Sequence, residues 1–247
     1  MGYETIEITP MTPRIGAEVS GIDLTESLGN QQFQELHDAL MEHSVLFFRN
    51  QDVDVEQHKN FGRLFGDLHI HPGSPPPPGH PEILIVHADK DSKHIAGENW
   101  HSDVTCDAEP PMGSILHLWE VPESGGDTLF ASMEAAYDDL SERMKIYLDG
   151  LNATHSGEQI YRGRYNNQKH DDTNVTYPRN VHPVVRTHPV TGRKSIFVNK
   201  TFTTHINEIP KAESDSVLAF LYSHCAKPDY QVRFKWQPHS IAFWDNR

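Results

Sequence analysis

The sequence predicts a single domain of mainly β structure with peripheral helices, arranged as a β-sandwich or jelly roll. Short apolar runs rich in β-branched and aromatic residues recur along the chain and are separated by Gly and Pro. These runs do not alternate regularly with helices, as a Rossmann-type sheet would require. With 247 residues, of which 36% are hydrophobic, the chain can bury a sizeable core.

The N-terminal part predicts two helices between short strands. Phe33, Leu36 and Leu40 stand near helical spacing and predict an amphipathic helix over residues 31–43. Asp54 and Gln57 match a capping box, which predicts a helix through residue 64. The proline-rich residues 69–78 predict a semi-rigid loop. Strands are expected at residues 5–9, 17–22 and 45–48.

Strands dominate after this loop. They are expected at residues 83–86, 115–119, 128–131, 181–186, 195–198, 231–236 and 241–244. Residues 189–192 predict the turn of a hairpin, because Pro and Gly stand at its ends. Helices are expected at residues 133–140, 142–148 and 211–224.

The composition of the chain argues against several classes of function. The formal charge of −14 opposes binding to nucleic acid or to an anionic membrane surface. No apolar run approaches the roughly 18 residues of a membrane span, and the first residues do not predict a secretory leader. Two cysteines, Cys106 and Cys225, are too few for a disulfide framework and favour a cytoplasmic location. A small anionic substrate would need local positive charge from a metal or an arginine.

The pair His101 and Asp103 is the strongest candidate for chemistry. In an extended strand these two side chains share one face, so both can bind one metal ion. They would supply two thirds of a 2-His-1-carboxylate facial triad, which leaves open positions on Fe(II). The pair precedes a strand expected to be buried, at residues 115–119.

Two other pairs have the same spacing. His87 and Asp89 end an apolar run and enter a polar loop, and His170 and Asp172 lie in a stretch without periodicity. We interpret both pairs as solvated loop residues. His117 lies inside an apolar run and is interpreted as an interior histidine with satisfied hydrogen bonds. Arg162 and Arg164 cover a pocket mouth or are simply solvated.

Several segments, taken together and in order, resemble the taurine dioxygenase family. They run from the N-terminal third to the last residue: 66–72, 99–105, 125–128, 182–192, 202–204, 233–238 and 244–247. The resemblance implies an Fe(II)- and 2-oxoglutarate-dependent oxygenase on a double-stranded β-helix. It also implies that the substrate is a small anionic organic molecule, with O2 as oxidant. Assembly into a homo-oligomer is left open.

Carried over by position, the resemblance assigns roles to five residues. It implies that His101 and Asp103 are iron ligands and that Thr128 binds 2-oxoglutarate. His71 would face a sulfonate, with the backbone of Val104 beside it. From the residues alone, Thr128 is a β-branched strand residue and His71 a surface histidine.

The sequence differs from that of taurine-cleaving members at two places associated with the amine of the substrate. Where taurine-cleaving members place a tyrosine, the chain has Gly73 and Ser74, and where they place an asparagine it has Gly97. We therefore expect an alkyl sulfonate without the amine, whose hydroxylated carbon releases sulfite and leaves an aldehyde. The alternatives are the same chemistry on a sulfate ester or aryloxyacid, or a non-catalytic β-sandwich that binds Zn or Ni.

The third iron ligand is not among these residues. The resemblance implies a histidine a few residues beyond Arg247, so the single domain of residues 1–247 is expected to lack a C-terminal segment. The arginines that hold 2-oxoglutarate and the substrate anion would also lie there. His239 is the alternative third ligand within the chain, although it precedes a strand in a turn.

Overall fold

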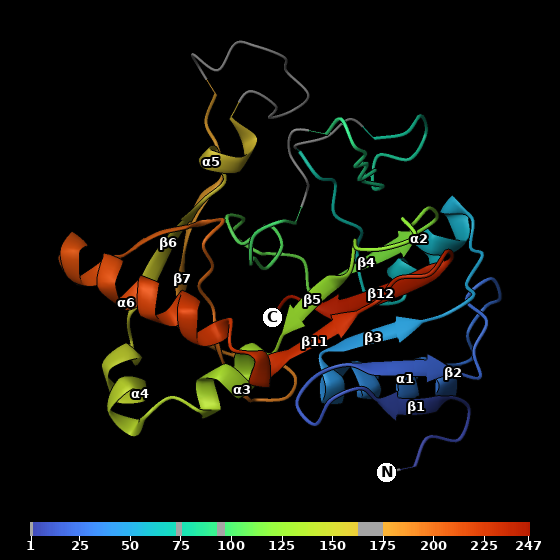
Figure 1. The fold of residues 1–247 in the computed structure, drawn as a ribbon, viewed down its shortest axis with the longest axis horizontal. Helices are drawn as coiled ribbons and strands as arrows, with labels where there is room; N and C mark the ends of the chain where they lie inside the picture. Colours follow the sequence, from blue (N-terminus) through green and yellow to red (C-terminus); the bar gives the residue numbers. More distant parts are fainter. Residues whose placement is uncertain (1, 73–75, 93–96, 163–174) are drawn as a thin grey trace.

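The computed structural model describes residues 2–72, 76–92, 97–162 and 175–247, and a five-stranded sheet forms one side of it (Figure 1). The spatial order is β1-β2-β3-β12-β4, with β2 and β3 parallel and the other neighbours antiparallel. β12 pairs with both β3 and β4, so the last strand of the chain is an interior strand of the sheet. The strands are β1 (Glu7–Pro10), β2 (Ala17–Ser20), β3 (Val45–Phe48), β12 (Ser240–Asp245) and β4 (Gly113–Leu118).

Residues of β3 alternate between the two faces of this sheet. Leu46 and Phe48 pack in one core cluster with helices α1 (Asn30–His43) and α2 (Val55–Arg63). Val45 and Phe47 pack in another cluster with β11 (Gln231–Phe234) and β5 (Thr128–Ala131). The rings of Phe47 and Phe234 stack with centroids 4.0 Å apart. The sheet is therefore covered by helices on one face and by a two-stranded ladder on the other.

A second body of sheet lies beyond β5 and β11, and Figure 1 shows α6 beside its strands. β6 (Asn152–Ser156) pairs antiparallel with β10 (Thr203–Ile206) and β7 (Arg179–Pro183). Ala153 and Ile206 share a core cluster with residues of the covering helices. These helices are α3 (Met133–Asp138), α4 (Glu142–Leu148) and α6 (Lys211–Cys225). The remaining elements are α5 (Glu158–Tyr161), β8 (Val185–Thr187), β9 (Lys194–Ile196) and η2 (Pro228–Tyr230).

The predicted class of strands with peripheral helices agrees with this arrangement. The bounds predicted for β3, β5 and α4 are those observed. The capping box is present: Gln57 N donates to Asp54 Oδ1 and Asp54 N donates to Gln57 Oε1, both at 2.8 Å. β8 and β9 form the predicted hairpin. No helix among the described residues is long and apolar enough to cross a membrane.

Three expectations of secondary structure were wrong. Residues 83–86 form no strand, and Ile85 is 58% exposed, because no described strand pairs with them. The strand expected at 181–186 is divided at Val184, whose N–H donates to Leu151 O instead of continuing a ladder. β6 and β10 were missed because they carry polar residues.

Candidate metal centre

His101 and Asp103 lie side by side, with His101 Nε2 3.2 Å from Asp103 Oδ1. Two ligand atoms at right angles about a metal, each about 2.1 Å from it, stand about 3.0 Å apart. The donor set and spacing therefore fit two neighbouring positions on one metal ion. The prediction that an extended strand creates this pair is wrong: residues 103–106 form a turn, and β4 begins only at Gly113.

A hydrogen bond fixes the orientation of the His101 ring. Its Nδ1 lies 2.7 Å from the carbonyl oxygen of Asn99, so this nitrogen donates and Nε2 of the neutral ring keeps its lone pair. In the protonated ring Nε2 donates to the Asp103 carboxylate, which raises the pKa of His101 against the effect of burial, and a metal ion would replace this proton. The ring nitrogen that faces Asp103 is thus the one available to a metal.

Asp103 is held from the sheet behind it. Ser114 Oγ donates to Asp103 Oδ2 at 2.5 Å, and Asn246 Oδ1 accepts from Asp103 N at 3.2 Å. Asn246 Nδ2 in turn donates to Ser114 Oγ at 2.9 Å. Burial raises the pKa of Asp103, but the hydrogen bonds from His101 and Ser114 outweigh it and lower the pKa below its usual value. The carboxylate is therefore ionised at neutral pH.

Val104 follows Asp103 in an unusual conformation. Its φ is +51°, and a β-branched residue in this region is a genuine outlier. Its side chain is buried in a cluster with Cys106, Tyr161 and Phe202. This conformation turns the chain sharply after Asp103, and Asp107 N donates to Val104 O at 3.0 Å.

The structure brings His71 into the same neighbourhood. Its ring packs edge-on against Tyr161 with centroids 5.5 Å apart, and Tyr161 packs in the cluster of Val104. The charge of His71 also lowers the pKa of Asp103. Gly73 and Ser74 lie outside the described residues.

Thr128 occupies the first position of β5. Its Oγ1 accepts from Trp236 Nε1 at 2.9 Å. Phe130 lies on the same face of the strand, and its ring lies 5.4 Å from that of Trp244, whose Nε1 donates to Asn246. Thr128 thus faces the sheet that carries Asn246, but it makes no described contact with His101 or Asp103.

Comparison with known proteins adds one decisive finding. A sequence profile of the taurine catabolism dioxygenase TauD, TfdA family matches residues 7–247. The chain belongs to this family.

Individual members show how similar it is. The chain is 35% identical over 255 residues to an alpha-ketoglutarate-dependent sulfonate dioxygenase of Saccharomyces cerevisiae, covering 98% of this chain and 61% of that protein. It is 38% identical over 255 residues to an alkylsulfatase of Acinetobacter baylyi, covering 99% and 78%. The crystal structure of AAD-2 in complex with Mn(II) and N-oxalylglycine superposes with a TM-score of 0.82 at 28% identity, covering 99% of this chain and 89% of that one.

The remaining candidates of this TauD, TfdA family member lie elsewhere. His87 and Asp89 are 3.5 Å apart and largely exposed, as the interpretation of a solvated loop predicts. His170, Asp172 and Arg164 fall outside the described residues, and exposed Arg162 pairs with Glu158. His239 precedes β12, whose other end reaches Asn246, so about 20 Å of strand separates it from Asp103. The described residues contain no group of three ligands.

His117 differs from its prediction. Trp119 Nε1 donates to its Nδ1 at 2.8 Å, but its buried Nε2 has no partner among the described residues. Burial, with the charges of His58 and His239, lowers the pKa of His117 to about 4. His117 is therefore a neutral histidine with a hydrogen-bond partner for only one of its two ring nitrogens among the described residues.

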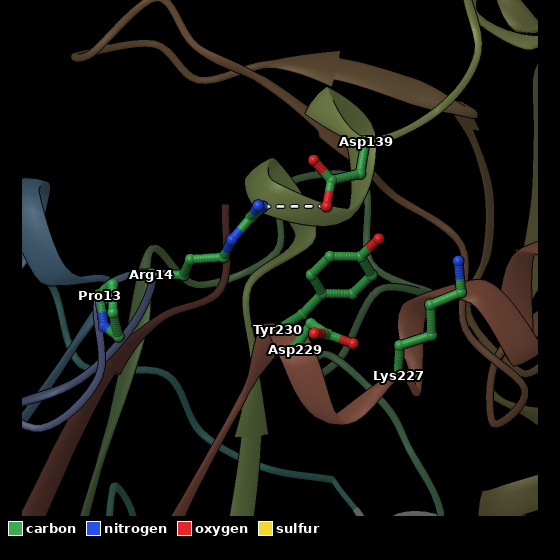
Figure 2. Close-up of a pocket in the computed structure, with 6 residues that line it drawn as sticks. All are labelled: Pro13, Arg14, Asp139, Lys227, Asp229 and Tyr230. Atoms are coloured by element: carbon green, nitrogen blue, oxygen red, sulfur yellow. Dashed lines mark ion pairs between the residues drawn. The ribbon is translucent and has the colours of Figure 1, made fainter.

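One cavity of this family member lies away from the candidate site. It has a volume of about 450 Å³ and is lined by Pro13, Arg14, Asp139, Lys227, Asp229 and Tyr230, whose side chains are drawn in Figure 2. Arg14 pairs with Asp139 at 3.1 Å, and both are about two-fifths exposed. The residues that line this cavity include neither His101 nor Asp103.

Ser114, Asn246 and Asn99 were not predicted as site residues. Ser114 and Asn246 are 132 positions apart in the sequence and meet because Trp244 pairs with Ser114 in the β4–β12 register. Asn99 and Asn246 lie in segments that carry the resemblance, 99–105 and 244–247, whereas Ser114 lies in none of them.

Proposed function

We propose that this TauD, TfdA family member is an Fe(II)- and 2-oxoglutarate-dependent dioxygenase acting on a small organic sulfonate or sulfate. The observation that carries the proposal is the 3.2 Å spacing of His101 Nε2 and Asp103 Oδ1, with both side chains oriented by further hydrogen bonds. The family and the solved structures similar to this chain support a double-stranded β-helix as the complete fold.

His101 and Asp103 would hold two neighbouring positions on the metal. Fe(II) bound there would accept 2-oxoglutarate and O2 together and supply the oxidation of a C–H bond. One oxygen atom enters the substrate, and the other enters succinate as CO2 leaves. Hydroxylation next to a sulfonate then yields sulfite and an aldehyde.

The other predicted residues would position the two organic anions. Thr128 Oγ1 accepts from Trp236, so its own proton is free to donate to 2-oxoglutarate. His71 and the N–H of Val104 would bind the substrate anion near Asp103. The work of these groups is positioning and exclusion of water rather than proton transfer.

The substrate we propose is an alkyl sulfonate or sulfate ester without taurine's amine. Gly97 has φ of +83°, and a Cβ there would stand 3.8 Å from Cε1 of His101. A polar side chain at position 97 would therefore lie beside the His101 ring. With glycine at this position, that space is open to the apolar part of the substrate. The named relatives act on a sulfonate or an alkyl sulfate. The cytoplasmic location and a homo-oligomer stay predictions.

The test is to supply the protein with a panel of substrates. Wild type and Asp103→Ala are supplied with Fe(II), 2-oxoglutarate and taurine, an alkyl sulfonate, an alkyl sulfate or an aryloxyacid. We expect succinate from wild type with the sulfonate or sulfate and none from the variant, because one imidazole and one further ligand cannot balance the charge of Fe(II). A wide preference for taurine would contradict the substrate, and full turnover by Asp103→Ala would contradict the site.

A further inference from the structure

The turn that follows Asp103 is fixed from the side opposite to Ser114 and Asn246. Val104 holds φ of +51° in this turn, a conformation that costs on the order of 1–3 kcal/mol and persists only where the surroundings impose it. Val104, Thr105 and Cys106 are all buried. The contacts of this turn should therefore show what imposes its conformation.

The hydroxyl of Thr105 is the centre of these contacts. Thr105 Oγ1 lies 2.8 Å from His155 Nδ1 and accepts from Asn199 Nδ2 at 3.1 Å. The amide of Asn199 can have only this orientation, because its Oδ1 accepts from the N–H groups of Thr201 and Phe202. His155 is fully buried on β6, with its ring between His182 and Phe197. The side chains of His155 and Asn199, each fixed by its own contacts, thus hold the hydroxyl of Thr105.

Strand β7 holds the next two residues. Asn180 Nδ2 donates to Cys106 O at 2.7 Å, and His182 Nε2 donates to Asp107 O at 2.9 Å. The side chain of Asp107 lies 3.0 Å from Nε2 of His69. The backbone carbonyls of both residues are therefore satisfied by the three-stranded sheet, whereas Asp103 is bonded to the five-stranded sheet.

We propose that Thr105, held by His155 and Asn199, is a positioning residue that keeps Val104 in its left-handed conformation and so holds the Asp103 carboxylate beside His101. The proposal rests on the metal site proposed above. Asp103 is bonded on one side and Thr105 on the other, so the strained residue between them has no freedom to relax. Without the Thr105 hydroxyl, Val104 can return to an extended conformation and move the carboxylate.

Thr154 provides a matched control for a purely structural role. It is a buried threonine on β6, next to His155, and its Oγ1 donates to Asn207 Oδ1 at 2.7 Å. Thr105→Val and Thr154→Val each replace one buried, hydrogen-bonded hydroxyl by a methyl group. Both should lower the melting temperature, but only the first touches the turn after Asp103.

The experiment measures the Mn(II) affinity of the protein with 2-oxoglutarate present, from the EPR signal of free Mn(II). We expect Thr105→Val to bind Mn(II) about 10–100-fold more weakly than wild type, Thr105→Ser to recover most of the affinity and Thr154→Val to match wild type. Wild-type affinity in Thr105→Val, or an equal loss in Thr154→Val, would overturn the proposal.

Two further variants keep the test decisive. If Thr105→Val does not fold, His155→Phe keeps a ring between His182 and Phe197 without the hydrogen bond, and His155→Asn restores a polar atom near the position of Nδ1. Weak binding by the first and recovery by the second is expected, and equal affinities would overturn the proposal. Asp103→Ala distinguishes failure of the metal-site proposal from failure of the Thr105 proposal. If this variant binds Mn(II) as tightly as wild type does, the metal site itself is wrong.

Discussion

At the scale of single residues, the Asp103 carboxylate depends on Ser114. Ser114→Ala removes the hydroxyl that donates to Asp103 Oδ2 at 2.5 Å. We expect Mn(II) affinity to fall about 10–100-fold, because groups that orient a metal ligand have effects of this size. Ser216→Ala is the control, since its hydroxyl bonds only the carbonyl of Ala212 on the exposed side of α6. Equal affinities in both variants would show that the Ser114 contact has no role in metal binding.

His155 predicts a dependence of stability on pH. Burial, with the charge of His182, lowers its pKa from 6.5 to about 4. The unfolded chain therefore binds more protons between these values, and the free energy of unfolding falls as pH decreases through this window, by about 3 kcal/mol from this ring. Urea unfolding at pH 7 and pH 4.5 should show a smaller pH dependence for His155→Phe than for wild type. The same dependence in both proteins would contradict this pKa.

The sequence predicts the pairing of His101 with Asp103 but not what creates it. Strand alternation would put the two side chains on one face, whereas Asp103 in fact begins a turn in which Val104 has a positive φ. A positive φ at valine has no sequence signal, because it is imposed by partners distant in the chain. Thr105 and His155 are 50 positions apart, and they meet only once the sheets are packed.

At the scale of elements, α2 begins where its capping box predicts. Asp54→Ala removes the acceptor for Gln57 N and leaves the helix start unsatisfied. We expect a loss of about 0.5–2 kcal/mol in the free energy of unfolding, with unchanged Mn(II) affinity because α2 carries none of the candidate ligands. Chemical denaturation measures the first quantity. A loss of metal affinity in this variant would mean that the helix contributes to the site.

Elements with a strong local signal were predicted, and elements defined by their partners were not. β3 is a run of four apolar residues, Val45–Phe48, and its bounds are correct. β6, Asn152–Ser156, has only one aliphatic residue and becomes a strand because β7 and β10 pair with it on both sides. Residues 83–86 show the converse, since an apolar run without a described partner stays irregular.

At the scale of the whole molecule, the candidate site lies where the two bodies of sheet meet. Asn246, at the end of the last strand, bonds Asp103 and Ser102, while the three-stranded sheet bonds Thr105, Cys106 and Asp107. The class of fold and the family were predictable from the order of motifs along the chain. The joining of two sheets across one turn was not, because it depends on contacts between the first half of the chain and the last.

The central claim is that His101 and Asp103 hold a metal that binds 2-oxoglutarate. The most direct measurement is an anaerobic titration of the protein with Fe(II) and 2-oxoglutarate, followed by visible absorption. We predict a weak charge-transfer band that requires both additions, which is absent in Asp103→Ala and retained in Asp54→Ala. A protein that only sequesters metal would give no band on adding 2-oxoglutarate. No band in wild type, or the same band in Asp103→Ala, would contradict the account.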